Sequence, residues 1–557
     1  MTHLETLDYV AILLYLILMG AIGLFFKWYV KDINAYTKGS NTIPWIVAGI
    51  SNFMALFSTF VFVAYAGIAY EHGLVSVTVF YSTIPACIIA ALFFAKRWRR
   101  AGVSSPIEYL ETRYNPALRQ TIGWVGLVMR ILDNMVRLYA IGIFLTAVTP
   151  LSFPVCLIIS SLIIIFFTLY GGIWAVSIMG TVQFVILIFT SIILCWISLD
   201  FVGGLETLTQ KVPDHFNFFN GPKGHFFWLG IYYIMIIIKY NENWIFIQRF
   251  YIVKDEKAAQ KVGYLSAALF FIFPVIFMIP PIVSKVIMPD LPDKEMAYVA
   301  ISSRLLPPGL MGVMIASMFA ATMSSLNSEY NVIASVITKD IYQRLLNKKA
   351  TDKQMLVTAK LSTVMVGLLV LLGGLFIKDF GGAFEANKLF TGIFAIPTGI
   401  PLIFGILSRK ASPNGAMLTV ILGSVAGIIL NSFPTVFTWE MATLLETILC
   451  ISIFYGSGLQ KFKDRAYLER VAELFKRLNE KIRDIPKIDV KFERALSILY
   501  ITSLVVAGIL FISMGLPAIG ELSGKLSVGS GFISLIFAII MWVIRKRGMN
   551  ENNRKGL

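Results

Sequence analysis

The stretch FAATMSSLNSEYNVIASVITKDIY, from Phe319 to Tyr342, decides the fold. Its apolar residues predict a helix that spans a membrane and leaves it at the polar residues that end the stretch. Ala321, Ser324 and Ser325 stand at positions i, i+3 and i+4, so they share one helix face. Such a face is typical of close helix packing, since small residues line most membrane helix interfaces. It is equally suited to an ion site, because hydroxyl groups supply hard oxygen ligands.

The composition places the whole chain in a membrane. Of its 557 residues, 57% are hydrophobic and 14% are charged, and the mean hydropathy is +0.76. Soluble domains carry about 25% charged residues. The long apolar segments do not alternate with polar residues, which excludes a membrane β-barrel. We therefore predict an all-α polytopic membrane protein. The net charge of +16 need not indicate nucleic acid, because Lys and Arg gather in cytoplasmic loops.

The apolar segments predict about fifteen spans of roughly twenty residues or more. Loop charges place the N-terminus on the outer side of the cell membrane and the C-terminus on the cytoplasmic side. The basic segment 461–494 and the Arg545 tail also lie on the cytoplasmic side. The N-terminus lacks the features of a signal peptide, so we expect the first apolar segment to be retained. The predicted spans are 7–29, 44–71, 73–96, 120–148, 152–171, 174–201, 226–248, 261–288, 309–338, 356–377, 387–407, 414–432, 438–458, 496–515 and 527–544.

Segment 461–494 interleaves Lys and Arg with Leu and Phe. It predicts an amphipathic helix near the inner leaflet, where anionic lipid attracts basic residues, or else a solvated connector. The four cysteines all fall inside apolar spans. Their spacing indicates neither a metal site nor a set of disulfides, so they are interpreted as small core residues. They are Cys87, Cys156, Cys195 and Cys450.

Ionisable residues inside the spans are candidates for function, because their burial in a membrane is costly. A neutralising ion-pair network is the structural alternative, and Lys239 with Glu242 could form an internal i, i+3 pair. Three groups are present: Arg130, Asp133 and Arg137 on one helix face; Lys239 and Glu242; and Glu329 beside the serine cluster.

Two spans are polar enough to predict a broken helix. The run KYNENW at 239–244 lies in the seventh span, and GISNFMALFST at 49–59 lies in the second. Broken helices survive at membrane depth only where they line a cavity or are buried in protein. They hold the solute and ion sites of secondary transporters, and a separation of five spans is what an inverted repeat of two five-helix halves would give.

Several short motifs in order resemble the sodium:solute symporter family, which includes the sodium/glucose, proline and sialic acid symporters. The resemblance covers at least 44–410. It rests on residues 49–58, PIEYLETRY at 106–114, YGGIWAV at 170–176, IQR at 247–249 with AAQK at 258–261, and the serine pair 324–325 ahead of DIY at 340–342.

The resemblance implies a leucine-transporter-like fold, with five plus five helices in inverted repeat, one N-terminal extra helix and several C-terminal ones. It also implies a sodium site formed by the carbonyl oxygens of Met54, Phe57 and Ala321 and the hydroxyls of Ser324 and Ser325. An all-oxygen shell of low charge suits a monovalent ion better than calcium. The implied parts are an N-terminal helix with its loop (1–43), the repeats 44–222 and 223–410, accessory helices (411–460), the basic segment 461–494 and C-terminal helices with a basic tail (495–557).

This chain departs from the family pattern in two places. Some members bind a second sodium with an aspartate at the position of Gly180, so we expect one sodium per cycle. The positions that bind galactose in the bacterial sugar member are all apolar here, so galactose is not expected to bind in the same way. They are Val61, Phe80, Ile236 and Phe270.

Cations at the family's solute positions favour an anionic or strongly polar solute. In the bacterial sugar member, a tyrosine that gates the solute site stands near the position of Lys239, and a glutamine on the tenth helix stands near that of Lys388. Asn134 and Arg137 fall near the site where the sialic acid member binds a carboxylate. A sugar acid such as sialate or a uronate fits; a neutral sugar or another small organic solute is the alternative. The predicted solute-binding residues are Ser58, Thr59, Phe80, Thr83, Asn134, Arg137, Lys239, Tyr240, Asn243 and Lys388.

These observations together predict sodium-coupled import of a small polar organic solute by alternating access. The expected partners are sodium, the solute and the lipid bilayer, and no nucleic acid; the oligomeric state does not follow from the sequence. A membrane solute sensor that acts through a partner protein on segment 461–494 is the alternative. An enzyme is not expected, because no His/Cys/Asp metal cluster, Gly-x-Ser-x-Gly motif or phosphate-binding loop is present.

Overall fold

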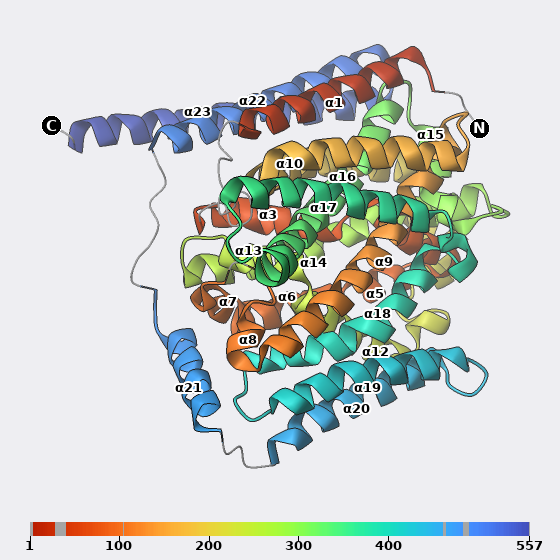
Figure 1. Cartoon of the computed structure of the whole chain (residues 1–557). Coiled ribbons are helices and arrows are strands. Elements are labelled where there is room, and N and C mark those ends of the chain that lie inside the picture. Colours follow the sequence, from red (N-terminus) through yellow and green to blue (C-terminus); the bar gives the residue numbers. More distant parts are fainter. Residues whose placement is uncertain (1–3, 28–40, 104, 460–463, 483–489, 556–557) are drawn as a thin grey trace.

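The computed structural model describes residues 4–27, 41–103, 105–459, 464–482 and 490–555, and within these ranges it is helical with no strand (Figure 1). Eleven of the described helices are long and apolar enough to cross a membrane, or up to 12 if a bent pair counts as one span. Two shorter apolar helices, Thr6–Ile22 and Phe153–Leu169, accompany them. The protein is therefore an all-α, multi-pass membrane protein, as predicted, although fewer helices pass this test than the spans predicted from sequence.

The first half of the chain contains the following helices: α1 (Thr6–Lys27), α3 (Trp45–Leu56), η2 (Val61–Tyr65), α4 (Ala66–His72), α5 (Val75–Phe80), α6 (Thr83–Ile89), η3 (Ala90–Phe94), α7 (Ala95–Ala101), α8 (Tyr109–Arg113), α9 (Pro116–Val148), α10 (Phe153–Val202), α11 (Gly204–Lys211), η4 (Pro213–Phe216), η5 (Pro222–Gly224), α12 (Phe226–Glu242), α13 (Trp244–Tyr251) and α14 (Glu256–Ile287).

The second half continues with η6 (Lys294–Met296), α15 (Ala297–Leu305), α16 (Leu310–Val336), η7 (Ile337–Leu346), α17 (Asp352–Gly374), η8 (Ile377–Phe380), α18 (Ala383–Gly399), η9 (Ile400–Phe404), α19 (Pro413–Ser432), α20 (Trp439–Gly456), η10 (Ser457–Leu459), α21 (Arg465–Asn479), α22 (Val490–Gly515), η11 (Leu516–Ala518) and α23 (Leu522–Lys555).

The serine-bearing helix α16 lies at the centre of the molecule. All of its residues are buried, and it packs against α1, α3, α9, α10, α13 and α17 (Figure 1). Its small side chains explain this, because they allow neighbouring helices to approach closely from every side. The face that carries Ala321, Ser324 and Ser325 is therefore surrounded by protein.

Both predicted helix breaks are present. Helix α3 ends at Leu56, Phe57 is extended (φ −73°, ψ 124°), and the segment that follows from Val61 is bent by 55° relative to α3. Helix α12 ends at Glu242, and Asn243 is extended before α13 begins. The Asn243 side chain accepts a hydrogen bond from the Ile245 amide (2.9 Å), so it caps the second half-helix.

Three sets of helices surround this core (Figure 1). Helices α19 and α20 pack together and against α18, and α22 and α23 form a hairpin beside α1 and α10. Helix α21 packs on α7 and α8. Its apolar face is buried against protein. The described part of the basic segment is therefore an amphipathic helix that packs on the protein, and not a solvated connector. That face consists of Tyr467, Val471, Leu474, Phe475 and Leu478.

Candidate functional site

The break after α3 faces α16 through a hydrogen-bonded contact. The Thr59 amide donates to Thr322 Oγ1 (2.9 Å), and the Thr59 hydroxyl donates to the Met318 carbonyl (2.9 Å). Because α3 ends here, its last carbonyl groups lack the partners that a continuous helix would supply. The predicted sodium residues Met54 and Phe57 stand at this end of α3, and the helix that carries the other three packs against it.

Oxygen atoms without partners gather beside this break. The hydroxyls of Ser324 and Ser51 are buried and make no hydrogen bond. A Cβ atom on Gly180 of α10 would lie 3.1 Å from Ser324 Oγ and 3.7 Å from Ser51 Oγ. The Ser325 hydroxyl donates to the Thr322 carbonyl (3.0 Å), which leaves its lone pairs free to accept. Hydroxyl and carbonyl oxygens without a carboxylate fit a small monovalent cation, and unpartnered buried hydroxyls are otherwise costly.

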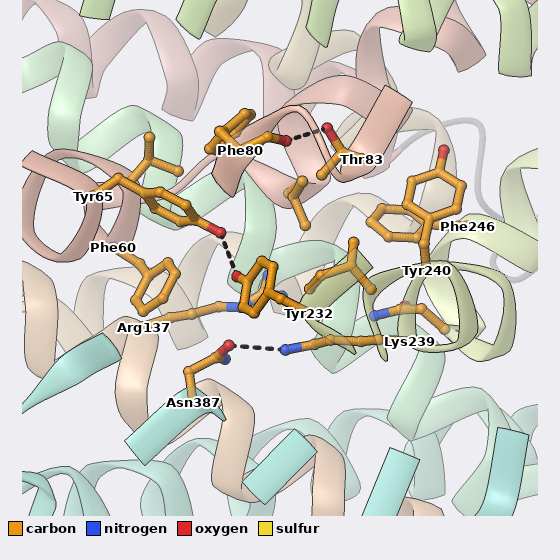
Figure 2. Close-up of a pocket in the computed structure, with 14 residues that line it drawn as sticks. Phe60, Tyr65, Phe80, Thr83, Arg137, Tyr232, Lys239, Tyr240, Phe246 and Asn387 are labelled. Atoms are coloured by element: carbon orange, nitrogen blue, oxygen red, sulfur yellow. Dashed lines mark hydrogen bonds between the residues drawn. The ribbon is translucent and has the colours of Figure 1, made fainter. Parts of the chain in front are cut away.

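A small cavity lies between the two helix breaks (Figure 2). Its volume is about 50 Å³, well below the roughly 300–1,000 Å³ of typical small-molecule pockets. A larger solute must therefore displace the side chains around it. The lining residues are Leu56, Phe60, Val61, Tyr65, Phe80, Thr83, Arg137, Tyr232, Ile236, Lys239, Tyr240, Asn243, Phe246 and Asn387.

Six of the ten predicted solute-binding residues line this cavity, namely Phe80, Thr83, Arg137, Lys239, Tyr240 and Asn243. Several of their polar groups already have partners. The Thr83 hydroxyl donates to the Phe80 carbonyl (2.9 Å), and the Tyr240 hydroxyl accepts from Asn52 Nδ2 (2.6 Å). Of the positions carried over from the sugar member, Val61, Phe80 and Ile236 line the cavity, and Phe270 stacks on Phe57 with ring centres 6.1 Å apart.

The other four predicted solute residues lie outside the lining. The Ser58 hydroxyl accepts from the Phe60 amide (3.3 Å), and Thr59 bonds to α16. Both amide atoms of Asn134 are buried without a partner. Lys388 pairs with Glu385 and lies 5.1 Å from the ring centre of Trp439.

Lys239 connects three helices at the wall of the cavity. Its ammonium group donates to Asp133 Oδ1 (3.2 Å), Asn387 Oδ1 (3.0 Å) and Thr391 Oγ1 (2.8 Å). The other carboxylate oxygen of Asp133 accepts from Arg137 Nη2 (2.8 Å). All three ammonium protons of Lys239 therefore have acceptors on α9 and α18.

The remaining charges complete a balanced set. Arg130 Nη2 donates to Glu242 Oε1 (2.7 Å), and Glu329 Oε1 lies 4.0 Å from nitrogen atoms of both Arg130 and Arg137. Lys239 and Glu242 thus each pair with α9 rather than with each other. Three cations face three carboxylates, and buried charges require such pairing.

Sequence reasoning missed Asn387, Tyr65 and Tyr232 of the lining. The hydroxyls of Tyr65 and Tyr232 share a hydrogen bond of 2.9 Å, and Figure 2 shows Asn387 facing Lys239. A signal was present for Asn387, because Asn387 and Thr391 stand at i and i+4 within an apolar helix. The tyrosines are common in membrane helices and gave no comparable signal.

The described residues hold no group of three or more His, Cys, Asp or Glu side chains that could bind a metal ion. Comparisons with known proteins place the chain in a family of transporters. A protein-family model described as "SSF: Sodium:solute symporter family" matches residues 36–423. The chain is 23% identical to the sodium/glucose cotransporter of Vibrio parahaemolyticus, over 81% of this chain and 90% of that protein.

Two further similarities involve sialic acid symporters. The chain is 25% identical to the sodium/sialic acid symporter NanT of Aliivibrio fischeri, over 84% of this chain and 96% of that protein. A solved structure of a Na⁺-coupled sialic acid symporter, in a substrate-bound outward-open state, superposes with a TM-score of 0.74 at 21% identity, over 82% of this chain and 98% of that one. This protein thus belongs to the sodium:solute symporter family, whose members are transporters and not enzymes.

Proposed function

We propose that this protein imports a small polar organic solute together with sodium by alternating access. The observation that carries the proposal is the break after α3, which faces a buried, unpartnered Ser324 hydroxyl on α16. Buried carbonyl and hydroxyl oxygens without partners destabilise the folded protein unless a ligand binds to them. Family membership supports sodium as that ligand.

Sodium would bind the carbonyl oxygens of Met54, Phe57 and Ala321 and the hydroxyls of Ser324 and Ser325. It would hold α3 against α16 in the outward-facing form. Coupling requires that sodium bind one conformation better than the other. The inward membrane potential supplies about 2.3 kcal/mol per charge per 100 mV, and release into the low-sodium cytoplasm frees α3 to move.

One sodium per cycle is proposed because Gly180 places no carboxylate beside Ser324. The reversal potential of the transport current, measured at several sodium and solute gradients, gives the stoichiometry directly. A ratio of two sodium ions per solute would overturn this part of the proposal.

A sugar acid, such as sialate or a uronate, is the proposed solute. The cavity lining combines Arg137, Lys239 and Asn387 with several aromatic rings. Similar proteins are named for glucose, sialic acid and myo-inositol. A carboxylate at Arg137 would accept two parallel hydrogen bonds. The other predicted solute residues would act after the cavity opens.

The proposed membrane arrangement has the N-terminus outside and the C-terminus inside the cell membrane. It comprises about fifteen spans, with the repeats 44–222 and 223–410 between accessory parts 1–43, 411–460, 461–494 and 495–557. The two helix breaks support the repeat, because α3 and α12 would be the first helix of each half. Accessibility of single introduced cysteines to a membrane-impermeant thiol reagent tests the orientation.

Uptake by proteoliposomes tests the function. Labelled sialate, uronates and neutral sugars are compared with and without an inward sodium gradient. Ser325→Ala should raise the sodium concentration needed for half-maximal uptake, and unchanged sodium dependence would reject the assigned site. Lys239→Ala should weaken solute affinity, whereas Lys257→Ala, at an exposed position of α14, serves as the control. Equal effects of the two lysine variants would remove Lys239 from the solute site.

A further inference from the structure

A second, larger cavity lies outside the transport core. Its volume is about 550 Å³, and it is enclosed by α3, the second half of α10 and the α22–α23 hairpin. The residues that matter most here are Ile46 and Val47 on α3, Ala507 on α22, and Phe537 and Met541 on α23. Ile46 and Val47 lie near the start of α3, whereas the other three lie within the apolar parts of α22 and α23.

The walls of this cavity are apolar and its rim faces the bilayer. Ile46 is 51% exposed and Phe537 is 54% exposed, and both belong to helices that the apolar segments place in the membrane. The polar groups are a few hydroxyls, among which the Tyr500 hydroxyl is buried. The hydrocarbon core contains no water that could fill such a space, so the surrounding molecules that can enter it are lipid chains.

A basic group lies just beyond the cavity. Arg545 follows Met541 by four residues and so stands on the same face of α23, one turn further on. Its Nε is buried and lacks a hydrogen-bond partner, and it makes no ion pair with any described residue. The apolar part of α23 ends at Val543, which places Arg545 at the level of the lipid headgroups.

A second cation stands at the same end of the molecule. The Lys261 ammonium lies 5.1 Å from the ring centre of Trp45, the residue between Pro44 and Ile46 of the cavity wall. Tryptophan and lysine are both typical of the membrane interface. An apolar cavity with cations at its headgroup end matches a phospholipid, with a chain inside and a phosphate outside.

We propose that this cavity binds one acyl chain of an anionic phospholipid from the leaflet at which α3 begins, with its phosphate against Arg545. Each CH₂ group that leaves the bilayer for the cavity exchanges one apolar environment for another, so the headgroup contact supplies the selectivity. Anionic headgroups attract nearby Lys and Arg side chains.

The bound chain would support the half of α3 that lies before the helix break. Ile46, Val47 and Ile50 form one wall of the cavity, and the sodium ligands proposed above stand at the far end of the same helix. This consequence rests on the proposed function. A chain in the cavity packs against these α3 side chains, so the bound lipid would restrain α3 until the chain is displaced.

Native mass spectrometry tests the lipid site without any transport assay. The protein is reconstituted in vesicles of phosphatidylglycerol and phosphatidylethanolamine, extracted into detergent and measured at low collision energy. Wild-type protein should retain one phosphatidylglycerol. Ala507→Trp fills part of the cavity, since Ala507 is buried in its wall, and should reduce that occupancy about tenfold. Arg545→Gln should lower the preference for phosphatidylglycerol over phosphatidylethanolamine.

The matched control is Ile509→Trp, which adds the same ring to the outer face of α22, where Ile509 is 55% exposed. It should retain the lipid like wild type. Equal occupancy in both tryptophan variants, or adducts of detergent alone, would overturn the proposal. Should Ala507→Trp not fold, phosphatidylglycerol with a photoreactive acyl chain can be applied to the unmodified protein. Cross-links within 500–507 support the site, and cross-links only to outer residues such as Ile509 reject it. Failure of sodium-driven uptake would leave these results unaffected.

Discussion

Arg137 donates a hydrogen bond of 3.0 Å from Nη1 to the carbonyl oxygen of Ala55. This contact joins the wall of the solute cavity to the last turn of α3, where the carbonyl groups lack helical partners. The same guanidinium group holds Asp133 through its other terminal nitrogen. One side chain therefore lies between the proposed solute site and the helix end that carries two of the proposed sodium ligands.

Arg137→Lys should lower sodium-driven uptake about tenfold. The planar guanidinium group can bind Asp133, Ala55 and a solute carboxylate at once, whereas an ammonium group lacks this geometry. The positive charge opposite Asp133 and Glu329 is kept, so the protein should still fold. We expect the apparent affinities for solute and sodium to weaken together. The measurement is uptake by proteoliposomes over a matrix of solute and sodium concentrations.

Arg97→Lys is the matched control, since Arg97 bonds to the Phe93 carbonyl on an exposed part of η3 and α7. It should change neither affinity. A variant Arg137→Lys with wild-type affinities would show that this residue only balances charge.

Replacing one partner of the Arg130–Glu242 pair should destabilise the protein strongly, and replacing both partners together should destabilise it less than the two single losses combined. Glu242→Leu and Arg130→Met each leave a buried charge without its partner, which costs about 3–5 kcal/mol. The double variant Arg130→Met, Glu242→Leu leaves no charge at this contact, so its loss should be smaller than the sum of the single losses. Denaturant unfolding of the four proteins in detergent gives the coupling energy. Strictly additive losses would mean that the two side chains act independently.

The sequence was sufficient for the local features that depend on one helix at a time. The polar runs at 49–59 and 239–244 predicted both helix breaks, because in each case polar residues interrupt an otherwise apolar span. The charged face of α9 was also evident from its spacing. The resemblance to a family then supplied the order of the helices.

Contacts between helices were not predictable in the same way. A shift of one residue turns a side chain by about 100° around a helix. For this reason the resemblance points to Lys388, whereas in the structure its neighbour Asn387 lines the cavity. The oppositely charged partners of Lys239 and Glu242 lie on α9, more than a hundred residues away. The larger cavity depends on how the α22–α23 hairpin packs beside α3 and α10, and no motif records that packing.

Gly180→Ala should raise the sodium concentration needed for half-maximal uptake several-fold. The added Cβ would lie 3.1 Å from Ser324 Oγ, so the hydroxyl must turn or shift away from its present position. A displaced hydroxyl is a poorer sodium ligand. Sodium titration of uptake at saturating solute measures the effect. Gly230→Ala has open space around its Cβ and should leave the titration unchanged, and an identical curve for both variants would place sodium away from Ser324.

Glu295 gives the folded protein a predictable dependence on pH. It lies in the loop element η6, outside the spans, and its Oε1 accepts a hydrogen bond from the first amide of α18, that of Ala383 (3.1 Å). Burial, together with the nearby charge of Asp293, raises the pKa of the Glu295 carboxyl from 4.5 to about 7. Between these two values the folded protein binds more protons than the unfolded chain, so its stability falls as pH rises from 4.5 to about 7.

Glu295→Gln removes this titration and keeps a neutral side chain of similar size. The variant should therefore match wild type near pH 4.5 and become the more stable of the two as pH rises to about 7, above which the difference stays constant. Thermal unfolding of both proteins across this range is the measurement. Glu469→Gln on the exposed face of α21 is the control, because the Glu469 side chain is 72% exposed. Parallel curves for wild type and Glu295→Gln would show that the loop carboxyl titrates as it does in water, and that its contact with α18 does not depend on its charge.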